Sequence, residues 1–434
     1  MRPGRVPSVK SRATKELELR TTSMAPSGEA VAHYEENDER RAVLVRGGTT
    51  GELVRARVDA SQRPARAEII EILEPSTWRL DPICKWSTEC GGCDWMHIAR
   101  AEQAIHHVAL TKSLAKDAKI DFHGSPRDVG YRTRARFHAS GGARRQSADK
   151  TRVGYFAPRT RSLVRVETCV VLDPRIDAAR GMLEGLLEGA HGDGEIALAL
   201  GKSAPVADIR WERDLPPAVF ARFDEAVRSK AFQGFRVLCG EARRPALFGD
   251  PTPVIRGADD APLELPPGGF SQAQEDVNRD LARRVAELTR GAKKILELYA
   301  GAGNLTVLLA RDHDVRAVES SEPACEAARK NLATRSLGAK VTCADAETFE
   351  IPSGTDTIVL DPPRTGAREA CERIQKTRSV KRIVYVSCDR PTLARDLDIL
   401  ASVFRVVSVD VFEMFPQTSH AETVVLLERT LPPK

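Results

Sequence analysis

The 434-residue sequence lacks any apolar stretch approaching the ~20 residues that a membrane-spanning helix needs. The first fifteen residues are basic and contain Pro and Ser, but they lack the apolar segment of a secretory signal and are predicted to form a disordered tail. A large net charge is also missing, because 66 Lys and Arg face 61 Asp and Glu. These absences predict a cytoplasmic protein that meets any polyanionic partner with a local basic patch.

The length predicts two or three domains, and the composition, 41% hydrophobic and 29% charged, is that of a soluble globular protein. Five short alternating segments between residues 16 and 75 indicate a small closed barrel of OB type. Residues 76–258 are expected to form a mixed α+β region, with helices near 97–117, 175–190 and 216–230. In the first of these helices, an apolar stripe is expected from Ile98, Ile105, Val108 and Leu114, which stand at helical spacing. Residues 259–434 are predicted to be a doubly wound α/β domain whose last two strands are antiparallel. Its expected strands are 294–300, 314–319, 340–345, 356–361, 381–388, 404–413 and 422–429.

One thiol stands at the carboxyl end of a predicted strand, where open α/β sheets carry their chemistry. The β-branched run from Ile383 ends at Ser387–Cys388, and a Pro-containing turn then opens a helical segment. A thiol beside a helix N-terminus can have a lowered pKa, which makes it a nucleophile. An isolated strand cysteine is more often a small core residue, but the neighbouring motifs favour the nucleophile here.

A strand-to-helix turn from Ile295 to Thr306 contains Gly301 and Gly303, and the next strand ends in Glu319. This spacing suits a carboxylate that binds the two hydroxyls of a ribose. Thr306 stands where a dinucleotide fingerprint has its third glycine. A cofactor without a pyrophosphate needs no such close helix approach, so S-adenosylmethionine is favoured over NAD. The strand predicted for residues 356–361 ends in Asp361.

Three cysteines fall within ten residues, and two glycines lie between the second and the third, which lets the backbone wrap round a metal. These are Cys84, Cys90 and Cys93, and the fourth soft ligand would be Cys169. The residues alone leave two possibilities, tetrahedral zinc or an iron–sulfur cluster. The remaining cysteines outside the strand-end motif, Cys239, Cys325, Cys343 and Cys371, are predicted to be packing residues.

A basic stretch runs from Pro126 to Arg165, with eleven Lys or Arg against two Asp or Glu. Tyr131, Phe137, Tyr155 and Phe156 are interleaved with these cations. Unpaired RNA is held by phosphate neutralisation and by stacking of bases on aromatic side chains. The stretch therefore predicts an RNA contact, although a solvated charged face is the more ordinary explanation.

The runs Asp361–Gly366, Ser387–Asp389 and Met414–Glu422 closely resemble the RNA 5-methyluridine methyltransferases, and the resemblance covers about residues 16 to 430. It implies an N-terminal TRAM barrel, a central RNA-binding region and a C-terminal class I (Rossmann-like) methyltransferase domain. It also implies methyl transfer from S-adenosylmethionine to carbon 5 of a uridine in RNA. The 23S ribosomal RNA is the favoured substrate, tRNA the alternative, and a monomer is expected.

The resemblance also implies site residues. Cys388 would attack carbon 6 of uracil, and Glu422 would be the general base. The cofactor would be bound by Gln272, Tyr299, Glu319 and Asp361, with Asn304 and Asp345 as weaker candidates. The ribosomal-RNA branch matches all four clustered cysteines, which implies a 4Fe–4S cluster at Cys84, Cys90, Cys93 and Cys169. By the same analogy, helix 97–117 is expected to pack on the catalytic domain.

The sequence departs from the family after the nucleophile, where Asp389 and Arg390 replace the usual Asn-Pro. Asp389 is expected to raise the pKa of the Cys388 thiol, and Arg390 to offset this effect. Two other classes remain open. An RNA-binding protein with a decayed catalytic domain is disfavoured because Cys388, Glu422, Asp361 and Glu319 are all present. A cytosine-5 RNA methyltransferase is disfavoured because Asp361-Pro-Pro-Arg lacks the second cysteine typical of that class.

Overall fold

The computed structural model describes residues 14–142 and 151–430. Within these, the chain forms two compact units. The first contains the residues up to Thr88 together with 93–106 and 417–419, and the second contains 89–92, 107–416 and the residues from His420 onward. Of the tail predicted for residues 1–15, residues 1–13 lie outside the described part. None of the described helices is both long and apolar enough to cross a membrane.

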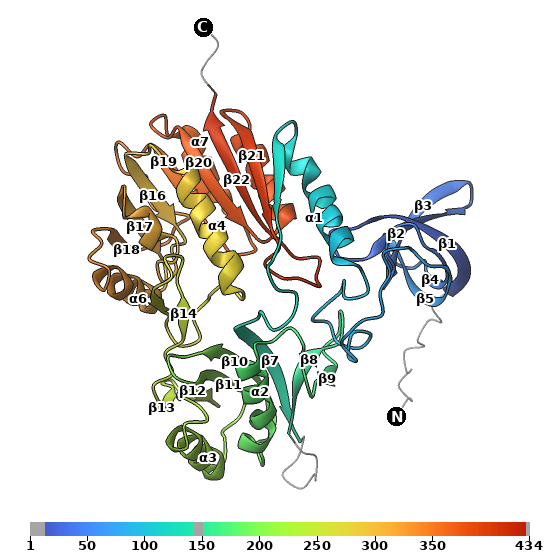
Figure 1. The fold of residues 1–434 in the computed structure, drawn as a ribbon, viewed down its shortest axis with the longest axis horizontal. Helices are drawn as coiled ribbons and strands as arrows, with labels where there is room; N and C mark the ends of the chain where they lie inside the picture. Colours follow the sequence, from blue (N-terminus) through green and yellow to red (C-terminus); the bar gives the residue numbers. More distant parts are fainter. Residues whose placement is uncertain (1–13, 143–150, 431–434) are drawn as a thin grey trace, which may run out of the picture. The chain divides into compact units, whose positions relative to one another are not determined.

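The first unit is built on a closed five-stranded barrel, in the order β1-β2-β3-β5-β4 (Figure 1). Every second side chain along the strands points inward, so Val43 and Val45 on one strand and Val54, Ala56 and Val58 on another are buried. The closed barrel expected for residues 16–75 is confirmed. Its strands are β1 (Thr14–Met24), β2 (Ala30–Glu36), β3 (Glu39–Arg46), β4 (Leu53–Asp59) and β5 (Ala65–Glu74).

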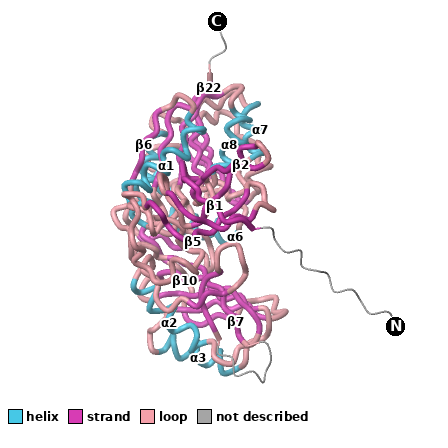
Figure 2. The backbone as a smooth tube through the Cα atoms, turned by 90° about the vertical axis from the view of Figure 1, so that its right-hand side faces the viewer, coloured by secondary structure: helices cyan, strands magenta, loops and turns pink. Residues whose placement is uncertain are grey.

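The second unit contains a seven-stranded sheet in the order β13-β12-β11-β10-β7-β8-β9. Two helices, α2 (Pro174–Leu186) and α3 (Pro217–Arg228), lie against it (Figure 2) and share one apolar core with it, so both helices predicted here are confirmed. The strands are β7 (Arg134–Gly141), β8 (Arg152–Phe156), β9 (Leu163–Arg165), β10 (Gly192–Leu200), β11 (Pro205–Trp211), β12 (Gly234–Cys239) and β13 (Ala246–Gly249).

The same unit contains an eight-stranded sheet in the order β18-β17-β16-β19-β20-β22-β21-β6. The first five strands in this order are parallel, whereas β22 is antiparallel to both of its neighbours, as predicted for the last two strands. Its strands are β6 (Lys119–His123), β16 (Lys294–Leu298), β17 (Asp314–Glu319), β18 (Lys340–Cys343), β19 (Thr357–Leu360), β20 (Arg382–Ser387), β21 (Phe404–Phe412) and β22 (Glu422–Arg429). A separate hairpin joins β14 (Val254–Arg256) and β15 (Pro262–Glu264).

Both faces of this sheet are covered by helices, as a doubly wound fold requires. Alternate residues of the central strands enter two different cores, so that Leu296 packs with α7 and α8 while Ile295 packs with α4. Figure 1 shows α4 lying across one face. The helices are α4 (Glu275–Leu288), α5 (Thr306–Leu309), α6 (Glu322–Ala333), α7 (Arg368–Lys376) and α8 (Arg390–Leu400).

One edge of the sheet comes from a distant part of the chain that the sequence did not reveal as a strand. Strand β6 pairs in parallel with β21, from Lys119 beside Ser408 to His123 beside Phe412. It follows α1 (Arg100–Ala115), whose last residues Leu114 and Ala115 join the core of the eight-stranded sheet. This end of the helix packs as expected, but the apolar stripe predicted through Ile105 is wrong, because Ile105 is 54% exposed.

Candidate active site

Three strand ends meet at one edge of the eight-stranded sheet. Asp361 follows β19 and Cys388 follows β20, and these two strands are parallel neighbours. Glu422 begins β22, which runs antiparallel to β20 with Ser387 opposite Thr423. The next residues along the two strands are Cys388 and Glu422, so the register sets the thiol beside the carboxyl group. The two residues predicted to be catalytic and Asp361 therefore lie at the same edge.

Burial governs the charge of these groups. It raises the pKa of the Cys388 thiol to about 12, and the negative charges of Glu422 and Asp361 add to the effect. It also raises the pKa of Glu422 to about 8, again with a contribution from Asp361, and the pKa of Asp361 to about 7. Arg364 opposes the increase at both Cys388 and Glu422. Burial therefore favours the protonated form of the thiol.

The residues after the nucleophile act differently from the prediction. Asp389 caps α8, because its carboxylate accepts hydrogen bonds from the backbone N–H and the hydroxyl group of Thr392 at 3.0 and 2.9 Å. A guanidinium N–H of Arg390 points to Nδ1 of His107, at 3.2 Å. The groups that act on the thiol are instead Glu422 and Asp361, which raise its pKa, and Arg364, which lowers it. A cap role for Asp389 could have been read from its place before Arg390-Pro391-Thr392.

The expected ribose-binding carboxylate, Glu319, lies at the end of β17 beside the glycine turn. One of its oxygens accepts a hydrogen bond from the backbone N–H of Gly301 at 3.0 Å, and the other from that of Ser321 at 2.8 Å. Gly301 has a φ of +56°, and no heavy atom lies within 4 Å of the position that a Cβ would take there. The carboxylate of Glu319 thus holds the backbone of the glycine turn, and the space beside the Cα atom of Gly301 is open.

The other predicted cofactor residues are engaged in local contacts. Tyr299 adopts a φ of +64° and donates its hydroxyl hydrogen to Glu347. Asn304 exchanges two amide hydrogen bonds with Asn278, at 2.8 and 3.0 Å. Asp345 is exposed and accepts from the backbone N–H of Glu347 at 2.9 Å. These contacts fix the shape of the turns that surround Gly301 and the end of β18.

Several buried polar atoms in this domain have no hydrogen-bond partner among the described residues, and two of them bear on the site. The amide oxygen of Gln272 is one, although the residue is only 7% exposed. An oxygen of Glu297 on β16 is the other, and burial raises the pKa of this carboxyl group to about 8. Unpaired buried groups are costly, so each calls for a ligand group or ordered water. Gln272 was predicted as a cofactor residue, whereas Glu297 was missed because a single Glu in a strand carries no signal.

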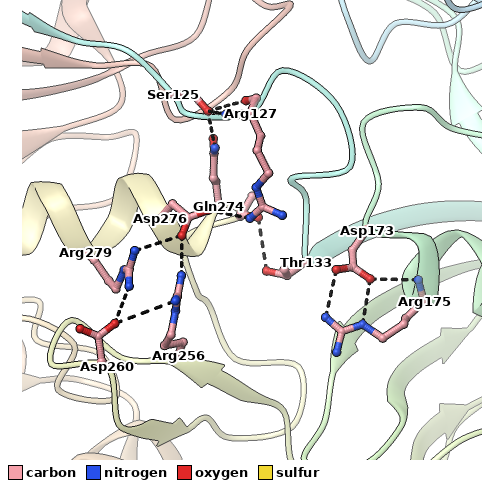
Figure 3. A network of polar contacts seen from close by, with 11 residues as sticks. Ser125, Arg127, Thr133, Asp173, Arg175, Arg256, Asp260, Gln274, Asp276 and Arg279 are labelled. Carbon is pink, nitrogen blue, oxygen red and sulfur yellow. Dashed lines mark hydrogen bonds and ion pairs between the residues drawn. The ribbon is translucent and has the colours of Figure 1, made fainter.

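The residues that follow Gln272 in the chain, up to Asp276, are held by the polar contacts shown in Figure 3. The backbone N–H of Thr133 donates to the carbonyl oxygen of Ala273 at 2.9 Å, and the side chain of Gln274 donates to the hydroxyl of Ser125. Asp276, in the first turn of α4, receives the guanidinium groups of three arginines. These are Arg127 at 2.7 Å, Arg279 at 3.1 Å and Arg256. The network fixes the start of α4 and the residues before it.

The four clustered cysteines fall in different units. Cys84 and Cys93 belong to the first and Cys90 and Cys169 to the second, and all are partly exposed. In the second unit the N–H of Gly91 donates to the carbonyl of Phe156 at 3.0 Å, and a Cβ at Gly91 would lie 2.8 Å from that oxygen. The N–H of Gly92 points to the sulfur of Cys90 at 3.4 Å. The glycines thus permit the tight turn that the sequence predicted.

Two aromatic residues expected to stack on RNA are instead core residues. Phe137 is fully buried and Tyr131 is 1% exposed, because alternate positions of a strand and its approach face the apolar core. Tyr155 and Phe156 remain partly exposed, and the ring of Phe156 stacks on His138 with centroids 3.7 Å apart. Residues 143–150 of the basic stretch lie outside the described part of the chain.

The predicted packing role fits three of the remaining four cysteines. Cys325 and Cys371 are fully buried, and Cys239 packs against the core of the seven-stranded sheet. Cys343 is exposed, so the prediction that it packs in a core is wrong. It lies at the last position of the edge strand β18, where the chain leaves the sheet.

Comparison with known proteins agrees with this site. Residues 345–430 match the family model for tRNA (uracil-5-)-methyltransferase, and residues 262–378 match that of the methyltransferase small domain. The chain is 30% identical over 444 residues to the 23S rRNA (uracil(1939)-C(5))-methyltransferase RlmD of Alkalilimnicola ehrlichii, covering 95% of this chain and 96% of that protein. It is 31% identical to an uncharacterized RNA methyltransferase of Caulobacter vibrioides, over 87% and 92% of the two chains.

Among solved structures, the fold is similar to that of the tRNA (uracil-54, C5)-methyltransferase of Pyrococcus abyssi in complex with S-adenosyl-L-homocysteine. The TM-score is 0.72 at 22% identity, and the match covers 95% of this chain and all of the other. The fold, together with 30% identity to the Alkalilimnicola protein over nearly the full length of both chains, leads to one assignment. The chain belongs to the RNA 5-methyluridine methyltransferase family and is an S-adenosylmethionine-dependent RNA (uracil-5-)-methyltransferase.

Proposed function

We propose that this enzyme methylates carbon 5 of a uridine in 23S ribosomal RNA through a covalent bond between Cys388 and the base. The observation that supports the mechanism most directly is the register that sets Cys388 beside Glu422 at the end of β20 and β22. The ribosomal substrate is supported by the relatives of similar length named 23S rRNA methyltransferases. A tRNA substrate is the alternative, because the similar solved structure is a tRNA enzyme.

Carbon 5 of uracil is a weak nucleophile, and adding a thiolate to carbon 6 turns the ring into a reactive enolate. Cys388 supplies the sulfur, and the positive charge of Arg364 favours loss of the thiol proton. The uridine must leave its stack so that both ring faces can be reached. When bound, S-adenosylmethionine supplies the electrophilic methyl group to carbon 5. Glu422 then takes the hydrogen of carbon 5 as a proton, and the carbon–sulfur bond breaks to release Cys388.

Two groups of the chain in particular suit the cofactor. Glu319 is held by two backbone N–H groups and keeps lone pairs for the ribose hydroxyls. The unpartnered amide oxygen of Gln272 suits a donor such as the amino group of the cofactor. We propose Tyr299, Asn304, Asp345 and Asp361 as the other residues that shape this site.

The proposed substrate is tested by mapping 5-methyluridine in ribosomal and transfer RNA from a strain that lacks the gene. One 5-methyluridine in 23S rRNA should disappear and should return when the wild-type gene, but not the Cys388→Ala gene, is supplied. Loss of the modification from tRNA alone would assign the enzyme to the alternative substrate. Unchanged 5-methyluridine in both RNAs would contradict the proposal.

We further propose that β1–β5 form a TRAM domain and that the partly exposed face of β7–β9 contributes to RNA binding. Support for the second point comes from a hollow of about 870 Å³ beside the stacked pair His138 and Phe156, which is also lined by Arg152, Arg161 and Arg210. Guanidinium groups bind phosphates, and a ring pair offers a surface on which a base can stack.

Cys84, Cys90, Cys93 and Cys169 are proposed to hold a 4Fe–4S cluster, because four thiolates are the ligand set of that cluster. Anaerobically purified protein should be brown and contain about four irons per chain. Cys90→Ser should lose most of the iron, whereas Cys239→Ser, which changes a cysteine outside the set, should keep it. Iron-free wild-type protein, or a Cys90→Ser variant with full iron content, would refute the cluster.

A further inference from the structure

A second group of sulfur and oxygen donors lies beyond the ends of β17 and β18. Glu322, Cys325 and Cys343 each offer one ligand atom, and these three atoms lie within 4.8 Å of one another. The topology explains why they meet. Cys343 is paired with Glu319 at the ends of two parallel strands, and α6 begins just after Glu319. Within α6, Glu322 and Cys325 are three residues apart and therefore face the same way.

Both thiols point to the turn between β17 and α6. The sulfur of Cys325 lies 3.3 Å from the carbonyl oxygen of Glu319, and the sulfur of Cys343 lies 3.5 Å from that of Ser320. Cys325 is buried, whereas Cys343 and Glu322 are exposed, so a ligand can reach the group from solvent. Packing in the core explains the presence of Cys325. It does not explain why the exposed thiol of Cys343 lies close to the thiol of Cys325.

The donor set fits a thiophilic metal better than it fits a disulfide. Two cysteines and a carboxylate are ordinary zinc ligands, and a water molecule can complete the tetrahedron. A disulfide would use only the two sulfurs, whereas a cation also uses the carboxylate of Glu322, and its binding displaces the thiol protons. Arg329, which donates to Glu322 at 2.9 Å, is an exposed partner that a cation can replace.

We propose that Glu322, Cys325 and Cys343 form a binding site for a thiophilic divalent cation such as zinc. A cation there would tie the first turn of α6 to the end of β18. It would thereby stiffen the turn that contains Glu319, whose carboxylate holds the backbone of Gly301. The site is separate from the cluster proposed at Cys84, Cys90, Cys93 and Cys169, and it does not depend on the RNA substrate.

The test uses the full-length, iron-replete protein, incubated with zinc and then dialysed. We expect one more zinc per chain in the wild type and in Cys239→Ser than in Cys343→Ser or Cys325→Ser. X-ray absorption at the zinc edge should show sulfur at about 2.3 Å with two sulfur ligands. This ligand count distinguishes the site from zinc bound by four cysteines in place of iron.

Thermal unfolding gives a second measurement, because a ligand that binds only the folded state raises the midpoint. The midpoint should rise with zinc concentration in the wild type and in Cys239→Ser, but not in Cys343→Ser. Since Cys343 is exposed, this variant decides the result even if Cys325→Ser fails to fold. Wild-type protein that retains no extra zinc, equal zinc in Cys343→Ser, or a zinc environment without sulfur would overturn the proposal. A disulfide between the two cysteines would overturn it as well.

Discussion

Cys388→Ala should abolish methyl transfer, lowering the rate by roughly a thousandfold or more, as expected for loss of a nucleophile. Affinity for S-adenosylhomocysteine should change little, because the groups proposed to hold the cofactor lie around Gly301, Glu319 and Gln272. The measurement is transfer of a labelled methyl group to RNA, together with calorimetric titration of S-adenosylhomocysteine. Cys239→Ala is the matched control and should keep nearly full activity.

The same thiol should form a stable bond with RNA that contains 5-fluorouridine. Methylation can proceed on this base, but carbon 5 then carries fluorine in place of the hydrogen that must leave as a proton. The complex should therefore survive denaturation, and peptide mapping should locate the link at Cys388. A link at another cysteine, or an active Cys388→Ala variant, would contradict the assignment of the nucleophile.

Glu422→Gln should slow release of the product far more than attack on the base, by roughly a hundredfold or more for loss of a general base. On ordinary RNA the variant should accumulate a covalent RNA–protein complex that migrates slowly on a denaturing gel. In the wild type, release should become faster as the pH rises towards 8, because burial raises the pKa of Glu422 to about 8 and only the ionised form accepts a proton. The variant should lose this dependence.

Glu326→Gln, on the exposed face of α6, is the control and should release product at the wild-type rate. Thermal unfolding provides a check that does not involve turnover. The folded state keeps the Glu422 proton up to about pH 8, whereas the unfolded state loses it near 4.5, so this group lowers stability as the pH rises between those values. The stability advantage of Glu422→Gln should therefore grow from pH 5 to pH 9. A constant difference, or wild-type release by this variant, would remove Glu422 as the base.

The sequence was most informative where function depends on strand order and strand ends. Asp361, Cys388 and Glu422 each stand at a boundary that hydrophobic runs make visible, and parallel neighbours end at the same edge. The sequence was uninformative where function depends on which loops meet. Arg364, which follows β19, lowers the pKa of the Cys388 thiol, whereas Arg390, two residues after Cys388 in the chain, points to His107. Adjacency along the chain suggested the wrong cation.

Burial was the other property that pattern alone did not supply. Phe137 looked like an RNA-stacking residue because it stands among arginines, but a strand sends alternate side chains to opposite faces and this ring enters the core. The prediction for Ile105 was wrong in the opposite sense, because this apolar residue was expected to be buried and is exposed. The buried face of α1 carries Gln103, whose amide donates to the carbonyl oxygens of Trp95 and Ile98 at 3.1 and 2.7 Å. Satisfied polar side chains can replace an apolar stripe, and no periodicity reveals this.

The pairing of β6 with β21 has a consequence for synthesis of the protein. The ribosome makes β6 early, yet the strand that pairs with it emerges about 290 residues later. Until then β6 is an unpaired edge that other chains could join, and the charged Lys119 and Asp121 on it discourage such pairing. The seven-stranded sheet lies between the two strands in the chain and can form first. The eight-stranded sheet is therefore completed only after β21 and β22 have been made, long after β6 has left the ribosome.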